Sequence, residues 1–233
     1  MRPSLTVEIW SDVVCPWCYI GKRRFEAAAA ELAEEVELEV VFRPYQLDPT
    51  ASPGTATPVI EAYAKKFGGA ERAEQIIGHV TAVAAGEGLE FHMERALRAN
   101  TLLAHRLLFL AEGAGRQYAM KERLLQAYFC DGLDIGDPDV LADCAAEVGM
   151  ERAAVREFLD STDGVVEVQA MLREAAEAQI TAVPTFVLDG RWAVPGAQDA
   201  ETFVNVVRRL LQRRESEADH TAADACTEEA CDV

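Results

Sequence analysis

Two cysteines separated by two residues, in Cys15-Pro16-Trp17-Cys18, are the residues of this chain best suited to chemistry. They follow an apolar, strand-like run, Leu5 to Trp10, and open a helix-like stretch. A thiolate at a helix N-terminus faces unpaired backbone N–H groups and the positive end of the helix dipole, which favour its ionised form. The thiolate is the species that attacks disulfides. The motif therefore predicts a redox pair, with Pro16 suited to the first helical turn.

The two cysteines are expected to have different roles. Cys15 lies at the mouth of the predicted helix, where solvent and substrate can reach it, so we expect it to be the nucleophile. Cys18 lies one turn inside and is expected to resolve the mixed disulfide. A zinc site or inert buried thiols are the alternatives, but zinc needs four ligands and no second CxxC or nearby His/Cys group joins this pair. No metal is expected here.

The elements around the pair predict an α/β fold. The first strand, the helix after Cys18 and a second strand, Glu37 to Tyr45, form a β-α-β unit. Residues 58–160 have almost wholly helical patterns. The last third returns to α/β, with a helix at 165–179, a strand that ends at the turn Asp189-Gly190, and a closing helix. The expected order of elements along the chain is therefore β-α-β, a helical insertion, and then α-β-β-α.

Composition limits the classes of function. The 233 residues are half hydrophobic, which is enough for a substantial core, and the net charge is −18. That charge argues against binding nucleic acid or anionic lipid, because both rest on Lys and Arg that neutralise phosphates. No run approaches the roughly 20 apolar residues that span a bilayer, and no apolar export segment precedes the motif. We expect a cytoplasmic protein, in which six cysteines serve redox chemistry and packing more than structural disulfides.

A second pair of cysteines, Cys226 and Cys231, lies in the segment 215–233, which carries seven acids and no Lys or Arg. Such a segment offers little to bury a thiol. We interpret the two as an auxiliary redox pair that exchanges electrons with Cys15 and Cys18 through a mixed disulfide. Metal capture by two thiolates beside carboxylates, and a tail whose thiols have no role, are the alternatives.

The sequence also predicts roles for two further cysteines and one histidine. Cys144 falls on the apolar face of a predicted helix and is expected to be a small core residue, and Cys130 is expected to be similar. His105 could border the active-site cleft or be a helical histidine with its hydrogen bonds satisfied.

The order of elements, with the CxxC at the first strand-helix junction and Val183-Pro184-Thr185 before the third strand, resembles the thioredoxin-fold DsbA family. Within that family the chain is most similar to the cytosolic FrnE-like subgroup. Further matching segments are Ser11-Asp12-Val13-Val14, Arg98-Ala99-Asn100-Thr101, Ala104-His105-Arg106-Leu107 and Gly196-Ala197-Gln198. The resemblance covers about residues 5–211 and implies a thioredoxin-like fold with a large all-helical insertion domain.

This resemblance divides the chain into four parts. Residues 1–57 and 163–214 are expected to form the thioredoxin-like domain, residues 58–162 the helical insertion domain, and residues 215–233 the acidic C-terminal tail with its cysteine pair.

The resemblance also implies a cis peptide bond before Pro184, with Val183 and Pro184 against the redox cysteines. A cis bond turns the chain sharply and would leave the Val183 backbone free to pair with an extended substrate segment. An ordinary trans proline at a strand's first residue is the alternative. Pro16, Trp17, Val183 and Pro184 are thus the expected substrate-binding residues. Periplasmic DsbA proteins carry His at the position of Trp17, and indole supplies no positive charge. We therefore expect a less stabilised Cys15 thiolate and a less oxidising protein.

These observations predict a thiol-disulfide oxidoreductase acting on protein or small-molecule thiols and disulfides, with disulfide isomerisation open to the same pair. No cofactor is expected, glutathione is a candidate redox partner, and the chain could be a monomer or a homodimer. One alternative is a glutathione-dependent isomerase or transferase of the 2-hydroxychromene-2-carboxylate isomerase or kappa class. Those enzymes typically have Ser at the position of Cys15, so the pair weighs against it. Another alternative is a redox- or metal-responsive chaperone or binding module.

Overall fold

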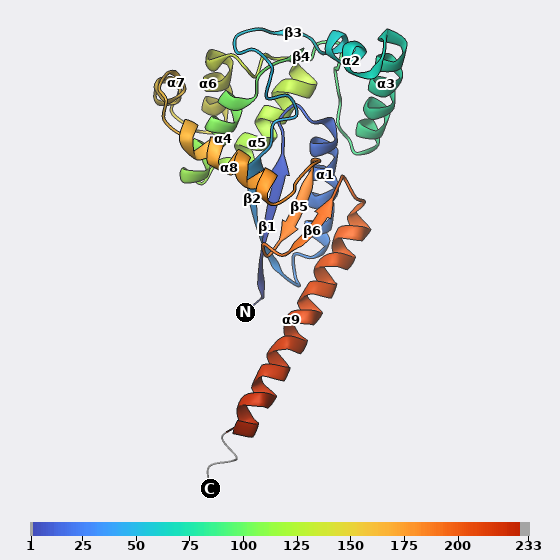
Figure 1. Ribbon diagram of the computed structural model, residues 1–233, viewed down its shortest axis with the longest axis vertical. Helices are drawn as coiled ribbons and strands as arrows, with labels where there is room; N and C mark the ends of the chain where they lie inside the picture. The colour runs from blue at the N-terminus through green and yellow to red at the C-terminus, as the bar shows by residue number, and fades with distance from the viewer. Residues whose placement is uncertain (1, 229–233) are drawn as a thin grey trace.

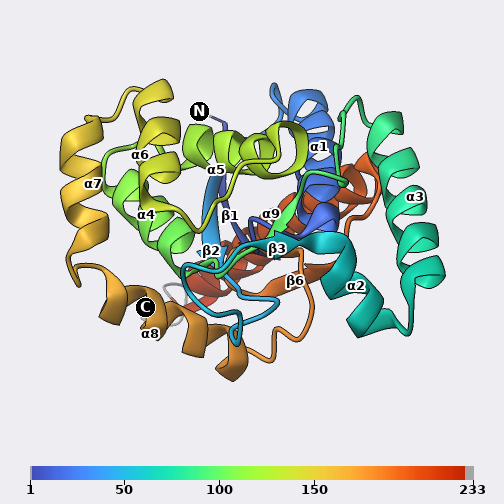
Figure 2. The same ribbon diagram turned by 90° about the horizontal axis from the view of Figure 1, so that it is seen from above.

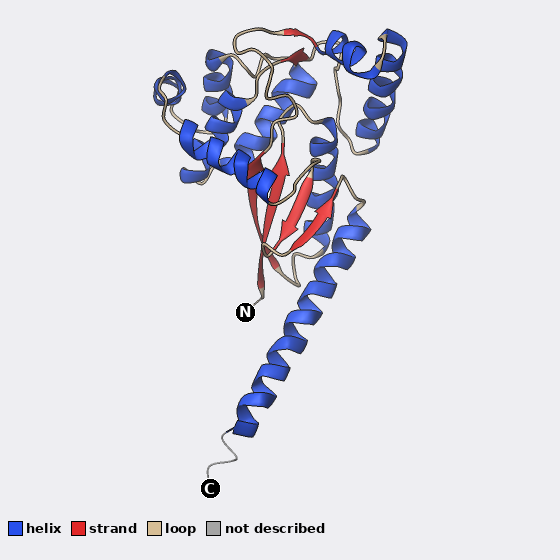
Figure 3. Ribbon diagram, in the orientation of Figure 1, coloured by secondary structure: helices blue, strands red, loops and turns tan. Residues whose placement is uncertain are grey.

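The computed structural model describes residues 2–228 and is built around a four-stranded sheet in the order β2-β1-β5-β6 (Figure 1). Strand β1 is parallel to β2 and antiparallel to β5, and β5 is antiparallel to β6. Figure 3 shows this sheet in red at the centre of the helices. The strands of the sheet and the two helices that pack on it are β1 (Ser4–Ser11), α1 (Pro16–Glu31), β2 (Glu37–Pro44), β5 (Thr185–Leu188), β6 (Trp192–Pro195) and α9 (Ala200–Glu228).

The sheet and two helices enclose one hydrophobic core. Alternate residues of β1, including Leu5, Val7 and Ile9, are buried, as expected for a strand whose side chains alternate between faces. They pack with Phe25 of α1 and Phe203 of α9, whose rings meet edge to face. The CxxC helix is therefore held against the sheet by apolar contacts along its length.

A helical region is inserted between β2 and β5, and it covers the end of the sheet where β1 ends (Figure 2). A short two-stranded pair, β3 with β4, ties the start of the region to its middle. The sequence patterns did not predict this pair, because two residues per strand are too few to show a period. The elements are β3 (Thr57–Pro58), α2 (Val59–Phe67), α3 (Ala70–Gly86), β4 (Leu97–Arg98), α4 (Leu102–Gly113), α5 (Gln117–Gln126), a π-helix (Ala127–Asp131), α6 (Pro138–Glu147) and α7 (Arg152–Asp160). Helix α8 (Val165–Glu177), which the sequence assigned to the second part of the thioredoxin-like domain, follows them and leads to β5.

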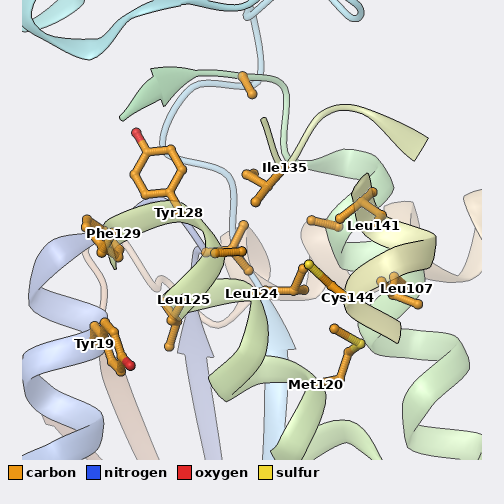
Figure 4. Close-up of a cluster of buried hydrophobic side chains, with 14 of the residues drawn as sticks. Tyr19, Leu107, Met120, Leu124, Leu125, Tyr128, Phe129, Ile135, Leu141 and Cys144 are labelled. Carbon is orange, nitrogen blue, oxygen red and sulfur yellow. The ribbon is translucent and has the colours of Figure 1, made fainter. Parts of the chain in front are cut away.

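The inserted helices have a second hydrophobic core, shown in Figure 4. Cys144 is completely buried in it beside Leu107 and Met120, so the prediction that it is a small core residue is confirmed. Cys130 differs, because it lies in the π-helix and is only partly buried. Tyr19 of α1 belongs to this second core, which therefore reaches the CxxC helix.

One side chain fastens the helical region to the edge strand of the sheet. Gln117, at the start of α5, accepts a hydrogen bond from the Phe42 backbone N–H (2.8 Å) and donates one to the Phe42 carbonyl (3.0 Å). The amide thus pairs with β2 as a neighbouring strand would. Because β2 is the edge of the sheet, this contact fixes α5 against it.

Helix α9 runs on past the sheet and extends away from the rest of the protein (Figure 1). It continues through the predicted boundary at residues 214/215 as far as Glu228. The segment after 215 is rich in Ala and Glu, which are strong helix formers, and it has no Gly or Pro to end a helix. None of the helices among residues 2–228 has both the length and the apolar character that crossing a membrane requires.

A cluster of charged and phenolic groups joins α1 to α5. The buried Lys22 ammonium lies 2.5 Å from Glu26 Oε1 and 2.6 Å from Glu122 Oε2. Tyr118 donates a hydrogen bond to Glu26, and Tyr19 donates one to Glu122. Burial opposes ionisation of both carboxyls, but the hydrogen bonds and positive charge of Lys22 outweigh it, and the pKa of each carboxyl is lowered.

This cluster predicts an acid-sensitive part of the folding stability. A carboxyl whose pKa is lowered by folding stabilises the protein fully above its unfolded pKa, and that contribution is lost as the pH falls through its folded value. We expect Glu122→Gln to lose roughly 1–2 kcal/mol at pH 7 and to flatten the fall in stability between about pH 5 and pH 2. Urea denaturation across this range measures both. The exposed Glu147→Gln is the control, and equal pH slopes for wild type and Glu122→Gln would contradict the assignment.

Candidate active site

The turn between β1 and α1 is held by a buried carboxylate. Asp12 is inaccessible to solvent, and its oxygens accept hydrogen bonds from the backbone N–H groups of Val13 and Leu47, both at 2.8 Å. The backbone carbonyl oxygen of Asp12 accepts a hydrogen bond from the Cys15 N–H at 3.4 Å. Asp12 therefore fixes the backbone that presents the first cysteine. The sequence showed it only as part of a matching segment, because its partners are distant in the chain.

His105 also supports this turn. Its Nε2 lies 3.2 Å from Asp12 Oδ1 and 3.0 Å from the Tyr45 carbonyl oxygen, so an N–H at this position can donate to both. The imidazole is buried and does not line the cavity described below. Of the two readings of His105, the structure supports the histidine with satisfied hydrogen bonds.

Cys15 is the N-cap residue of α1, and Pro16 is the first residue of the helix. The Cys15 sulfur accepts a hydrogen bond from the Cys18 backbone N–H at 3.3 Å, so it meets one of the unpaired donors of the helix N-terminus. Both cysteines are free thiols. Burial, and then the neighbouring Cys15 sulfur, raise the pKa of the Cys18 thiol. The Cys15 sulfur therefore meets a donor of the helix N-terminus, whereas burial holds Cys18 as the protonated thiol.

The loop before β5 brings Val183 and Pro184 to the redox pair. The Val183-Pro184 peptide bond is cis, which confirms that prediction. The Val183 carbonyl oxygen lies 3.6 Å from the Cys15 sulfur, close enough to accept a weak hydrogen bond from the thiol. Pro184 is buried, and its own carbonyl accepts from the Gly196 N–H at 2.7 Å.

A cavity of about 850 Å³ opens beside Cys15. Its lining includes Cys15, Pro16, Trp17 and Val183 around the redox pair and apolar residues of α2 and α3. Both cysteines are 3% exposed, so the exposed fraction alone does not distinguish them. The two cysteines differ instead in that Cys15 lines the cavity and Cys18 does not.

The cavity mixes apolar and charged groups. Tyr63, Phe67 and Val80 form its apolar part, and burial, together with the nearby Cys15, raises the pKa of Tyr63 to about 12. The lining carries charges of both signs: Lys65, Lys66 and Arg98 are positive, and Asp48 and Glu61 are negative. Arg98 is paired with Asp48, so the two lysines leave a small local excess of positive charge in a chain whose net charge is −18.

Trp17 is exposed, as expected for an apolar contact residue, with 38% of its surface accessible. Its indole lies 6.2 Å from the His79 ring of α3, measured between ring centroids. Trp17 therefore lies against α3 of the inserted helices.

The second cysteine pair is outside the site that can be described. The backbone at Cys226 is helical, but its side chain and all of Cys231 lie outside the described residues. Among the residues whose side chains are described, no three His, Cys, Asp or Glu are grouped as a metal would require.

Gly21 allows α1 to approach the loop that carries Pro184. A Cβ at this position would lie 3.0 Å from Pro184 Cγ and 3.3 Å from the Ala197 backbone. We expect Gly21→Val to lower stability by about 1–3 kcal/mol and turnover of disulfides by about tenfold, because the loop must move away from Cys15. Thermal unfolding and steady-state kinetics measure the two effects.

Gly78, a helical glycine in α3, provides the matched control. No atom lies within 4 Å of the Cβ it would gain, so Gly78→Val should keep stability within about 0.5 kcal/mol and leave turnover unchanged. Equal behaviour of the two variants would show that the close approach at Gly21 has no role.

The fold and the site together define a class of protein: a parallel β-α-β unit and a β-hairpin, interrupted by a largely helical region, with a CxxC at the first helix and a cis-proline beside it. This is the thioredoxin fold with a helical insertion. The sequence matches the DSBA-like thioredoxin domain over residues 6–208, and the chain belongs to this family. The predicted DsbA-like fold class is confirmed.

Individual relatives agree with this assignment. The chain is 37% identical to a probable DsbA oxidoreductase, SCO1869 from Streptomyces coelicolor, with a TM-score of 0.83 over 88% of this chain and 89% of that one. The uncharacterized protein YwbO of Bacillus subtilis is 30% identical over 88% of this chain and 96% of its own length. The cytosolic disulfide reductase DsbM of Pseudomonas aeruginosa, also solved with GSH, shares the fold at 19% identity and a TM-score of 0.61, over 89% and 98% of the chains.

Proposed function

We propose that this protein is a cytoplasmic thiol-disulfide oxidoreductase of the FrnE-like kind, with Cys15 as nucleophile and Cys18 as resolving thiol. The arrangement at Cys15 supports this most strongly. Its sulfur lies at a helix N-terminus, accepts the Cys18 N–H and borders the cavity, whereas Cys18 is a buried thiol behind it. Pro16, Trp17 and Val183 line the cavity and provide the surface against which a substrate disulfide binds, whereas Pro184 is buried next to Val183.

In the reducing direction the reaction has two steps. The Cys15 thiolate attacks one sulfur of a substrate disulfide, which forms a mixed disulfide and releases the first substrate thiolate. Cys18 then loses its proton and attacks the Cys15 sulfur, which releases the second substrate thiolate and leaves a Cys15–Cys18 disulfide. Two electrons pass from the protein to the substrate. Oxidation of a substrate dithiol is the reverse sequence, and isomerisation uses the first step and its reversal.

The substrates fit the cavity by its chemistry. Its apolar wall suits a nonpolar side chain beside the disulfide, and Lys65 and Lys66 suit a carboxylate. Protein disulfides and glutathione both meet this description, so we propose glutathione as the redox partner. The chemistry needs no further cofactor, because the two thiols supply both electrons.

The test is an equilibrium titration of the purified full chain in glutathione redox buffers, with alkylation and mass spectrometry to follow each cysteine. We expect a reversible Cys15–Cys18 disulfide with a potential below the ~−120 mV of DsbA, because Trp17 adds no positive charge to stabilise the thiolate. The same mapping shows whether Cys226 and Cys231 exchange with the pair. If Cys15 and Cys18 stayed reduced in every buffer, the proposal would fail.

A further inference from the structure

Two tyrosines of the cavity have hydroxyl groups that bond no other group of the protein. Of the five tyrosines of the chain, Tyr19, Tyr45 and Tyr118 each donate a hydrogen bond to a carboxylate or carbonyl oxygen. The other two, Tyr63 and Tyr128, line the cavity of the redox pair, and no group whose position the structure describes bonds their hydroxyls. Since a buried phenol normally finds a partner, these two hydroxyls need an explanation.

Tyr128 is the more informative of the two. Only 2% of its surface is exposed, and its ring packs edge to face on Phe129, with 4.7 Å between the ring centroids. Figure 4 shows its hydroxyl pointing away from Leu124 and Leu125 of the helical core. The residue belongs to the π-helix, a rare conformation that is frequent at functional sites. Packing therefore holds the ring in place, while the side chain forms part of the cavity wall.

Both phenols keep their protons at the pH values at which thiols exchange with disulfides. Burial, and then the nearby Cys15, raise the pKa of Tyr63 to about 12. Burial, and then the nearby Tyr63, raise the pKa of Tyr128. The cavity therefore presents two neutral O–H donors.

The rest of the cavity does not satisfy these hydroxyls. Most of its lining residues are apolar. Of its two carboxylates, Asp48 accepts hydrogen bonds from Thr50 and Arg98, and Glu61 is exposed to water. A substrate that enters the cavity displaces water from its wall, so it leaves the two donors unpaired unless it brings an acceptor of its own.

We propose that the hydroxyls of Tyr63 and Tyr128 donate hydrogen bonds to amide carbonyl oxygens of a peptide-like disulfide substrate, an inference that rests on the proposed function. A neutral carbonyl matches neutral donors on an apolar wall, whereas a carboxylate would lose more of its hydration there. Lys65 and Lys66 remain for a carboxylate elsewhere on the same substrate. The two tyrosines thus select disulfides that carry amides, because a substrate without them leaves both hydroxyls unpaired.

Tyr63→Phe and Tyr128→Phe test this with three symmetrical disulfides. Diacetylcystine bis(methylamide) has amide carbonyls and no charge, dithiodipropionate has carboxylates, and cystamine has no acceptor oxygen. The reduced protein is oxidised by each, and the rate constant is followed by acid quenching, alkylation and mass spectrometry. We expect each variant to react about fivefold or more slowly with the amide substrate, through weaker binding, and to keep its rates with the other two within about twofold. Both variants should fold normally, because the hydroxyl that is removed has no partner in the protein.

Tyr118→Phe is the matched control. It makes the same change at an exposed tyrosine that does not line the cavity, so the ratios between the three substrates should match those of wild type. Three outcomes would overturn the inference and leave the oxidoreductase function standing: equal losses with all three disulfides, unchanged rates with the amide substrate, or a loss confined to dithiodipropionate. If reduced wild-type protein reacted with none of the three disulfides, the proposed function itself would fail.

Discussion

Replacing Cys15 with serine is expected to lower the turnover of disulfide substrates by at least about 10³-fold. A serine hydroxyl is not ionised near neutral pH and cannot form a disulfide, so neither step of the reaction can begin. The measurement is reduction of insulin disulfides with glutathione as the electron source. The protein should remain folded, because the sulfur makes only two hydrogen-bond contacts, with the Cys18 N–H and the Val183 carbonyl.

Cys18→Ser separates the two roles. This variant keeps the attacking thiol, so we expect the first step to proceed and a stable mixed disulfide on Cys15 to accumulate, visible as an added glutathione mass. Cys130→Ser is the control, since this partly buried cysteine does not line the cavity, and its turnover should match wild type. Turnover that survives in Cys15→Ser would contradict the assignment. If neither the wild type nor any variant showed thiol-dependent turnover but the protein suppressed aggregation, the alternative hypothesis of a chaperone or binding module would be favoured instead.

Arg106→Ala is expected to cost at least about 3 kcal/mol of stability. Arg106 is buried, and its guanidinium donates hydrogen bonds to four backbone carbonyls that follow or end helix α7. The four acceptors are the carbonyl oxygens of Phe158, Leu159, Ser161 and Asp163. Removing the side chain takes a hydrogen-bond donor from each of these carbonyls, of which that of Phe158 keeps the Ser161 N–H and hydroxyl, and it leaves a cavity in the helical core.

Chemical denaturation at pH 7 measures this effect, and Arg152→Ala provides the comparison. Arg152 is the first residue of α7, the helix whose end Arg106 holds, but it is exposed and pairs with carboxylates of α6. Its loss should therefore shift the unfolding midpoint little. Midpoints that fall equally in both variants would show that the carbonyl contacts of Arg106 contribute nothing special. Arg106→Lys should recover only part of the loss, because one ammonium cannot reach four carbonyls.

The parts of the fold that could be predicted are those that depend on local sequence patterns, such as hydrophobic periodicity and turn residues. The strand before Cys15, the helix after it and the hairpin at Asp189-Gly190 all lie within a few residues of where the sequence placed them. The extent of α9 was not predicted, because the acidic composition of its last turns indicated a tail, whereas their Ala and Glu residues favour a helix. The π-helix before Gly132 has no pattern of its own and arises from packing.

The residues of the site likewise divide into those that the sequence could predict and those that it could not. Cys15, Cys18 and Trp17 could be singled out because one motif contains them, and Pro184 because a resemblance placed it there. Asp12 could not, since its partners Leu47 and His105 are far from it in the sequence and near it only after folding. The burial of Lys121 in α5 could not be predicted either, because a charged residue in an amphipathic helix is ordinarily exposed and nothing in the surrounding pattern distinguishes it from a surface lysine.

The pairing of Gln117 with Phe42 has a consequence for how the protein behaves in a crowded solution. An edge strand exposes N–H and C=O groups that can recruit a strand from another chain and begin aggregation. The Gln117 amide occupies one such donor and one such acceptor near the end of β2, and it does so with the same geometry that an intruding strand would use. A contact that positions a helix therefore also closes part of the edge to polymerisation, next to Arg43 and Pro44, which end the strand.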